Sequence, residues 1–319
     1  MSWRLIPIDK RSPALHQAEF GCLKRAYAIN VTRGCSFYCV YCYARGYAIA
    51  PSKGTVYLYQ NLPLLLQKEA RRLPMGTPII FNTASECFQN HPHILEITYR
   101  SMAILLRRGH HINFLTKGIV PKWFKDLFCR YRHHIQATID VVSLKEDYCN
   151  LFEPGAPIGE KRLEGAIHLL NWGIPVKARL DPLIPFFSDT QENIENLLLA
   201  IKDCGIRKII ISYLELRPRI IEQLRQELPA SIAKIILGCF PKLSWDRVGS
   251  KTLCKQVPLS IREKVYQRIR QQGEKLGIKV VVCRCKNPDV NFSQYCLPKS
   301  GLPKQKRLFQ PVLFENMRL

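Results

Sequence analysis

The sequence has no long hydrophobic run: no apolar stretch reaches the roughly 18 residues that a membrane-spanning helix needs. Residues 1–7, MSWRLIP, also lack the apolar core of a secretory signal peptide. We therefore expect a cytoplasmic protein with no membrane partner. The 319 residues are 47% hydrophobic, which suffices for a sizeable core and excludes a long disordered protein.

Acidic residues are scarce. The chain has 25 Asp and Glu against 48 Lys and Arg, a formal net charge of +23. Such an excess favours an anionic partner, of which nucleic acid is the commonest. A basic, solvated surface without a partner is the alternative, because charge alone carries no information on specificity.

Cysteine, in contrast, is abundant, with thirteen residues. A high, odd number of cysteines in a chain without an expected signal peptide argues against a disulfide framework. It favours metal or cluster ligation together with ordinary buried thiols.

Short β-rich apolar runs alternate with helical patterns along most of the chain. The expected strands are 26–32, 77–82, 112–116, 135–142, 175–180 and 208–213, and the expected helices are 60–72, 93–108, 121–129, 159–172, 190–204 and 217–228. This alternation predicts parallel βα units and an α/β fold. Six units fit a partial (β/α)6 barrel, with a complete eightfold barrel as the alternative.

The regular pattern weakens after about residue 230. We expect a strand at 231–237, an amphipathic helix at 259–276, a strand at 278–283 and an irregular tail at 286–319. The predicted organisation is an N-terminal segment (1–25), a barrel (26–230) and a small C-terminal extension (231–319).

Three cysteines, Cys35, Cys39 and Cys42, follow the first expected strand with the spacing C-x3-C-x2-C. A 4Fe–4S cluster normally takes four thiolates, so three thiolates in one loop leave one iron open to a cofactor or substrate. The alternative, a structural zinc site, needs a fourth Cys or His nearby, and none lies within the next twenty residues.

The motif resembles that of the radical S-adenosylmethionine (SAM) superfamily, and further segments across roughly 26–215 resemble its spore photoproduct lyase-like group. These are NVTRGCSFYCVYCYAR, IIFNTASECFQ, INFLTKG, LFEPGAP and ARLDPLIP. The resemblance implies that the open iron binds the amino and carboxylate groups of SAM. An electron from the reduced cluster then cleaves SAM, giving a 5′-deoxyadenosyl radical that abstracts hydrogen from the substrate. It also implies a flavodoxin- or ferredoxin-type electron donor.

The resemblance further suggests SAM-binding residues at the carboxyl ends of the strands. The backbone of Tyr41 would contact adenine, Asp140 would contact the ribose, and Lys177 or Arg179 would pair with the carboxylate. Asn82, Thr83 and Ser85 occupy the segment that receives the amino group, where Glu86 could also serve. The alternatives are a solvent-facing Asp140, and Arg179–Asp181 and Glu153–Arg162 pairs that only brace the barrel.

The other cysteines allow several interpretations. Cys87 lies near the position from which a cysteine of the lyase-like group returns a hydrogen atom, but a buried or surface thiol is the alternative. Cys283, Cys285 and Cys296 have the spacing C-x-C-x10-C. They could bind an auxiliary iron–sulfur cluster with Cys239 or Cys254, bind zinc, or be unrelated thiols. We expect Cys22 to be an ordinary thiol.

Three functions remain open from the sequence. The first is a radical enzyme, lyase-like or otherwise, that repairs DNA or modifies nucleic acid. Basic residues interleaved with Tyr213, Phe240, Trp245 and Tyr266 suit a flipped or single-stranded base. The second is a radical enzyme that modifies a peptide or metabolite and carries an auxiliary cluster. The third is a non-enzymatic iron–sulfur or zinc module that binds nucleic acid.

Overall fold

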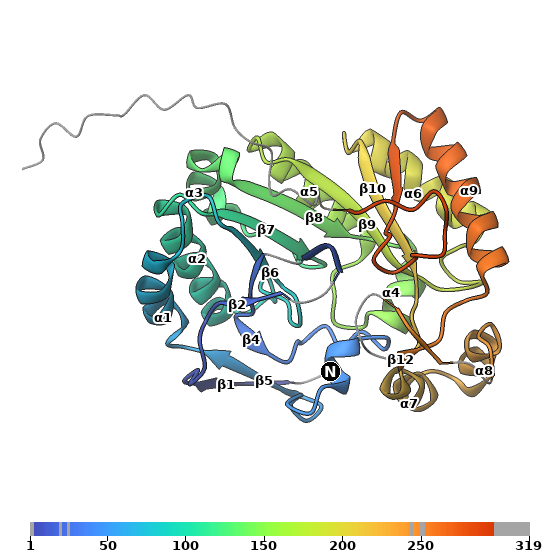
Figure 1. The fold of residues 1–319 in the computed structure, drawn as a ribbon, viewed down its shortest axis with the longest axis horizontal. Helices are drawn as coiled ribbons and strands as arrows, with labels where there is room; N and C mark the ends of the chain where they lie inside the picture. Colours follow the sequence, from blue (N-terminus) through green and yellow to red (C-terminus); the bar gives the residue numbers. More distant parts are fainter. Residues whose placement is uncertain (1–2, 19–20, 24–25, 243–244, 249–252, 297–319) are drawn as a thin grey trace, which may run out of the picture.

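An eight-stranded, mostly parallel sheet forms the centre of the protein. The computed structural model describes residues 3–18, 21–23, 26–242, 245–248 and 253–296. The strand order is β13-β10-β9-β8-β7-β6-β3-β2. The strands are β13 (Lys279–Val282), β10 (Lys208–Tyr213), β9 (Val176–Leu183), β8 (Ile135–Asp140), β7 (His111–Thr116), β6 (Pro78–Phe81), β3 (Tyr27–Ile29) and β2 (His16–Gln17). Only β2 runs antiparallel to its neighbour (Figure 1).

Helices flank the sheet on the left and right of the view in Figure 1. The main ones are α1 (Leu62–Glu69), α2 (Pro92–Arg107), α3 (Lys125–Arg130), α5 (Gly159–Asn171), α6 (Gln191–Asp203) and α9 (Leu259–Lys275). Side chains alternate between the two faces of a strand, so one face of each strand can pack into the hydrophobic core. On β9, Ala178 and Leu180 are in the core, whereas Lys177, Arg179 and Asp181 lie on the opposite face.

The sheet is an open barrel. In the described part of the chain, β13 and β2 are its two edges and do not pair with each other. This confirms the expected α/β fold with a partial barrel. The strand expected at 278–283 is β13, and it joins the six expected barrel strands as a seventh parallel strand. The eightfold closure does not occur among the described strands.

A second, three-stranded sheet lies beside the barrel. It contains β1 (Arg4–Ile8), β5 (Thr55–Tyr59) and β4 (Thr32–Arg33), in the order β1-β5-β4. The expected strand 26–32 is therefore divided: β3 belongs to the barrel and β4 to the small sheet. This division turns the chain away from the barrel directly before the three cysteines.

Most other expected elements are present within a few residues of their predicted bounds. The expected strand at 231–237 is wrong: this segment is α8 (Ala230–Gly238), which begins after Pro229. A short apolar run does not by itself distinguish a helix from a strand. Here the buried residues are Ala233 and Ile236, which are three positions apart, as on one face of a helix.

The sequence did not predict α4 (Glu146–Phe152) or the β11–β12 hairpin (Asp246–Arg247 and Leu253–Cys254). Residues 297–319 of the expected irregular tail lie outside the described residues. The described helices include none with the length and apolar character of a membrane span. The division into three parts stays a prediction.

Candidate active site

The three cysteines lie in a loop, residues 34–42, which we call the cysteine loop. It follows β4 through Gly34, whose φ is +90° and whose α-carbon faces Pro51 and Thr55. A Cβ at Gly34 would lie 2.6 Å from Pro51 Cγ, so both the backbone conformation and the close approach require glycine. Since β3 and β4 lead into it, the loop is at the carboxyl edge of the barrel, where barrel enzymes place their chemistry.

The three thiols interact electrostatically with one another. Burial raises the pKa of both Cys35 and Cys39, and the nearby Cys42 raises each further. Thiols with a raised pKa are protonated at neutral pH, and a metal ligand must lose this proton. Iron binding to the loop must therefore include the loss of these protons.

Residues distant in sequence fix the backbone of the cysteine loop. Gln89 accepts a hydrogen bond from Ser36 N (2.7 Å), and its amide donates to Thr32 Oγ1 (2.9 Å). Val40 N donates to the carbonyl of Phe152 (3.0 Å), at the end of α4. These contacts tie the loop to the segment after β6 and to the segment after β8.

A second set of contacts comes from α7 (Pro218–Glu227). Arg45, just after the loop, forms an ion pair with Glu227 and donates to the carbonyl of Cys39 (3.2 Å). Gln223 donates to the carbonyl of Cys42 (3.3 Å). The backbone carbonyls of Cys39 and Cys42 are thus anchored, directly or through Arg45, to a helix about 180 residues further along the chain.

A buried network of charges lies behind the loop. Glu153 is fully buried and forms an ion pair with Arg162, which is 1% exposed. Tyr41 donates its hydroxyl hydrogen to the other oxygen of Glu153. Lys117 Nζ lies 2.7 Å from Asp140 Oδ1 and 3.6 Å from Glu153 Oε1. The network joins the cysteine loop, the ends of β7 and β8, and α5.

The charges of this network are mutually compensating. Burial by itself would raise the pKa of Glu153, but Arg162 and Lys117 lower it to about 2. Burial raises the pKa of Asp140 to about 6, against the opposing effect of Lys117. Asp140 is 4% exposed, so it does not face solvent as the alternative supposed. The predicted Glu153–Arg162 pair is present.

The segment after β6, residues 82–85, lies beside the cysteine loop and borders the site. Asn30 accepts hydrogen bonds from Ala84 N (2.8 Å) and Ser85 N (3.2 Å), and donates to Thr83 Oγ1 (2.9 Å). Tyr43 donates its hydroxyl hydrogen to the carbonyl of Thr83. Thr83 and Ser85 are thereby held against the cysteine loop. The sequence reasoning missed Asn30, although it stands at the end of the first barrel strand.

Glu86 braces two strand ends. One of its oxygens accepts from Asn82 Nδ2 (3.0 Å), Thr116 Oγ1 (2.8 Å) and Phe88 N (2.9 Å), and the other accepts from Lys117 N (3.0 Å). Burial raises the pKa of Glu86, whereas the hydrogen bonds from Phe88, Thr116 and Lys117 lower it. Asn82 itself adopts a left-handed conformation, with φ of 69°.

The cations predicted on β9 already have partners. Arg179 forms an ion pair with Asp181, as the bracing alternative supposed, and Lys286 Nζ lies 2.8 Å from Asp181 Oδ1. Lys177 donates to Gln136 Oε1 (2.8 Å), and burial and the charge of Lys208 lower its pKa to about 8. The sequence did not predict a role for Lys286. This residue follows β13, and it lies near Asp181 of β9 because the sheet places these two strands on either side of β10.

Cys87 is fully buried in the hydrophobic core, and its carbonyl accepts a hydrogen bond from Thr98 on α2 (2.9 Å). This position agrees with the buried-thiol alternative; the hydrogen-donor role stays a prediction.

Of the aromatic residues expected along the open side, Tyr213, Phe240 and Tyr266 are buried, while Trp245 is 38% exposed.

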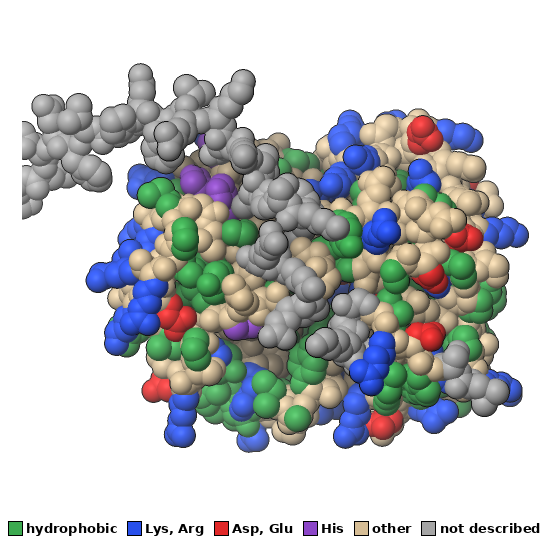
Figure 2. Space-filling model, viewed as in Figure 1, with side chains coloured by type: hydrophobic (Ala, Val, Ile, Leu, Met, Phe, Trp, Pro, Cys, Tyr) green, Lys and Arg blue, Asp and Glu red, His purple; other side chains and the backbone are tan. Residues whose placement is uncertain are grey.

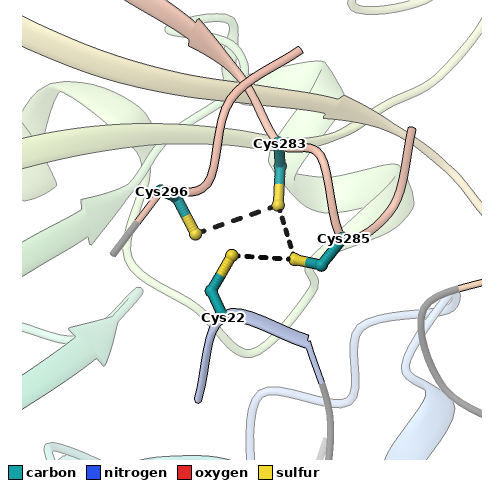
Figure 3. Close-up of side chains that lie close together, drawn as sticks. All are labelled: Cys22, Cys283, Cys285 and Cys296. Atoms are coloured by element: carbon teal, nitrogen blue, oxygen red, sulfur yellow. Dashed lines mark hydrogen bonds between the residues drawn. The ribbon is translucent and has the colours of Figure 1, made fainter. Parts of the chain in front are cut away.

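Four cysteines form a second group, which we call the thiol cluster. Cys22 joins Cys283, Cys285 and Cys296, and the four sulfur atoms all lie within 4.8 Å of one another (Figure 3). In the described residues this is the one set of three or more Cys, His, Asp or Glu close enough to share a single ion. Neither Cys239 nor Cys254, expected as a fourth member, takes part. The sequence did not predict that Cys22 belongs to this group, because Cys22 and Cys285 are more than 260 residues apart in the chain.

The fold and the site together define an open α/β barrel with a three-cysteine loop at its carboxyl edge. Comparison of the sequence with protein families matches the radical SAM superfamily over residues 29–201, more than half of the chain. The chain belongs to this superfamily. Membership implies a 4Fe–4S cluster and SAM as cofactors.

Two uncharacterized proteins are similar to this chain over more than half of its length. An uncharacterized protein of Methanocaldococcus jannaschii is 25% identical over 169 residues, 52% of this chain and 63% of that protein. An uncharacterized protein of Acidianus two-tailed virus is 20% identical over 202 residues, 59% of this chain and 66% of that protein. The matched region thus spans slightly less than two thirds of each relative.

Spore photoproduct lyase, solved in complex with dinucleoside spore photoproduct, has a similar fold, with a TM-score of 0.66. The match covers 88% of this chain and 82% of the lyase, at 16% sequence identity. The likeness establishes a shared fold.

Replacing Glu153 by Gln should strongly destabilise the protein, because Arg162 would remain buried without its anion and Lys117 would keep only Asp140 as an ion-pair partner. The pKa of about 2, against an ordinary 4.5, corresponds to about 3 kcal/mol of unfolding free energy. Urea unfolding at neutral pH measures this loss. Glu164→Gln is the control, since Glu164 is exposed and pairs with Lys161 on the same helix.

The same experiment has a pH dependence of known sign. The pKa of Glu153 is lower in the folded protein than in the unfolded chain. Its stabilisation is therefore complete above the unfolded value of 4.5 and is lost as the pH falls toward 2. The difference between wild type and Glu153→Gln should shrink over that range; a constant difference would contradict an ionised Glu153.

Gly155→Ala should disturb the cysteine loop without touching a thiol. A Cβ at Gly155 would lie 2.2 Å from Ser36 O and 2.8 Å from Phe37 Cα, so the loop backbone would have to move. We expect the affinity for the cluster to fall by about tenfold, as for other losses of ligand support. Iron content after anaerobic reconstitution measures this. Gly238→Ala is the control, since its Cβ would meet no atom within 4 Å; equal iron content in both variants would refute the effect.

Proposed function

We propose that Cys35, Cys39 and Cys42 hold the 4Fe–4S cluster, that SAM binds beside it, and that the enzyme repairs or modifies nucleic acid. The observation that carries the proposal is the three-thiol loop, fixed at the carboxyl edge of an open barrel. Thiolates are the ligands that iron–sulfur clusters take. When bound, the reduced cluster supplies the electron that cleaves SAM.

The spacing of the loop thiols supports a cluster over a single ion. Cys35, Cys39 and Cys42 influence one another electrostatically. They do not belong to the single group of described residues whose ligand atoms are close enough together to share one ion. In a cluster each thiolate binds a different iron, so the sulfur atoms stay further apart than around one metal ion. The loop therefore fits the cofactor that the superfamily implies.

The walls of the site support specific roles in SAM binding. Asn30 orients Thr83 and Ser85, so that this segment, with Asn82, can receive the amino group. The hydrogen bond from Tyr41 to Glu153 fixes the loop backbone that would contact adenine. Glu86 already accepts four hydrogen bonds and serves better as a brace.

Ion pairs orient the remaining candidates. Asp140, held by Lys117, is proposed to contact the ribose. Arg179, held by Asp181, is the better partner for the SAM carboxylate. Lys177 is the weaker candidate for this role, because Gln136 already accepts its hydrogen bond and burial disfavours its charged form.

Charge and exposed aromatic groups support a nucleic-acid substrate. The chain carries a net charge of +23, and Figure 2 shows Lys and Arg side chains around the visible face with few acidic ones. Beside the cysteine loop, the guanidinium of Arg217 lies 4.9 Å from the ring centre of the partly exposed Tyr43. A cation next to an aromatic ring suits stacking on a base. The fold shared with a lyase that binds a dinucleoside is consistent with this substrate class.

The second candidate function is a radical enzyme that modifies a peptide or metabolite. Its support was an auxiliary cluster at Cys283, Cys285 and Cys296. The compact arrangement of the thiol cluster fits one ion better than several irons, and this weakens the alternative.

Cys39→Ala should abolish SAM cleavage, because the loop would lose one of its three cluster ligands. The measurement is 5′-deoxyadenosine formed by the anaerobically reconstituted, chemically reduced protein. Cys204→Ala, a half-buried thiol that ends α6, is the control and should cleave SAM like the wild type. Undiminished 5′-deoxyadenosine from Cys39→Ala would refute the assignment of the cluster.

Binding to single-stranded DNA or RNA should weaken steeply as salt increases, since Lys and Arg would replace the counterions of the phosphates. Replacing Arg217 by Gln should weaken binding and make the logarithmic salt slope shallower by about 1. Fluorescence anisotropy at several salt concentrations measures both. Arg219→Gln is the control, because Arg219 is 70% exposed and pairs with Glu222. No binding at low salt would contradict the nucleic-acid substrate.

A further inference from the structure

The thiol cluster has the dimensions of a site for a single metal ion. The sulfur atoms of Cys22 and Cys285 lie 3.1 Å apart, those of Cys283 and Cys285 2.9 Å, and those of Cys283 and Cys296 3.8 Å. Four thiolates at about 2.3 Å from a tetrahedral zinc ion lie about 3.8 Å from one another. A 4Fe–4S cluster would require wider spacing, since each thiolate binds a different iron.

Disulfide bonds do not explain this arrangement. A disulfide needs a sulfur–sulfur distance of about 2.05 Å, and all four cysteines are free thiols. Figure 3 shows the four side chains pointing toward a common centre. Four converging thiols, two of them buried and two half-buried, form a closed ligand set with no position left for substrate.

The backbone holds three of the ligands in place. Cys283 N donates to the carbonyl of Ile211 (3.2 Å), and Arg284 N donates to the carbonyl of Gln294 (2.9 Å). Asn287 donates its side-chain amide hydrogen to the carbonyl of Cys283 (3.0 Å). These bonds fold residues 283–296 back on themselves, so that Cys296 reaches Cys283.

The fourth ligand approaches through a close contact. Gly21 adopts a φ of +54°, and a Cβ there would lie 2.8 Å from Cys285 Cβ and 3.1 Å from Cys285 Sγ. A residue with a side chain at position 21 would push Cys22 away from its partners. The segment before β3 is therefore shaped to bring Cys22 against the loop after β13.

The surroundings suit a tetrathiolate site, which carries a charge of about −2 with zinc. Ile210 and Val281 pack against the cysteines and exclude water. Strand β9 pairs with β10, the strand that carries Ile210. Its residues Lys177 and Arg179 lie close enough to Cys296 to interact with it electrostatically. Apolar contacts and nearby cations both favour a buried anionic centre.

We propose that Cys22, Cys283, Cys285 and Cys296 bind one structural zinc ion that joins the two edges of the open barrel. Cys22 lies between β2 and β3, at one edge of the sheet, and the other three cysteines follow β13, at the other edge. No pairing of described strands connects these edges. The ion thus replaces the hydrogen bonds that close a complete barrel.

Metal analysis of protein purified anaerobically tests the proposal. We expect one zinc ion per chain, in addition to iron. A variant with Cys35, Cys39 and Cys42 all replaced by Ala should lose its iron and keep its zinc, so this test is independent of the proposed function. Cobalt exchanged into the site should give the intense visible absorption typical of tetrahedral thiolate coordination.

Variants locate the ion. Cys22→Ser and Cys285→Ser should lose most of the zinc, whereas Cys204→Ser should keep it. Hydrogen exchange should increase in Gly21–Leu23 and 283–287 when Cys22 is replaced. The same increase should follow when a chelator removes the zinc from the wild type, which needs no variant to fold.

Three outcomes would overturn the proposal. Iron near eight per chain with little zinc would indicate a second cluster. Iron near five per chain with no zinc would indicate a mononuclear iron site. Absence of a second metal, with the four thiols joined as disulfides in freshly purified protein, would indicate an oxidised pair of bridges.

Discussion

The buried carboxylate of Glu153 connects the parts of the protein on which the site depends. It accepts the hydroxyl hydrogen of Tyr41 from the cysteine loop, pairs with Arg162 of α5 and lies near Lys117 after β7. A buried anion is tolerated only where cations and donors surround it. This requirement fixes the loop relative to the strand ends, and the position of the thiols follows from it.

The open sheet creates a different constraint. Its edges carry unpaired backbone groups, and proteins cover or connect such edges. Here β2 and the following segment lie at one edge, β13 and its loop at the other, and the thiol cluster lies between the two segments. A metal ion at this place would connect the two edges of the open barrel.

The two groups of cysteines illustrate how sequence spacing is read. C-x3-C-x2-C after a strand identified one complete loop, because all its ligands are local. C-x-C-x10-C identified three of four members of the second group, because the fourth, Cys22, arrives from the opposite edge of the sheet. Likewise, Glu86 was placed near the site from strand order, but its hydrogen-bond partners were not, and Asn30 was missed altogether.

The sequence by itself determined the βα alternation and the loop of Cys35, Cys39 and Cys42, since these depend on local periodicity and spacing. The radical SAM family entered through the resemblance of the motifs along the barrel, and the sheet order excluded the eightfold closure among the described strands. Only the tertiary structure decided which charges meet. It paired Asp140 with Lys117, buried Cys87 in the core, turned 230–238 into a helix and brought Cys22 to Cys285. Such contacts depend on packing between segments far apart in the chain, about which residue spacing carries no information.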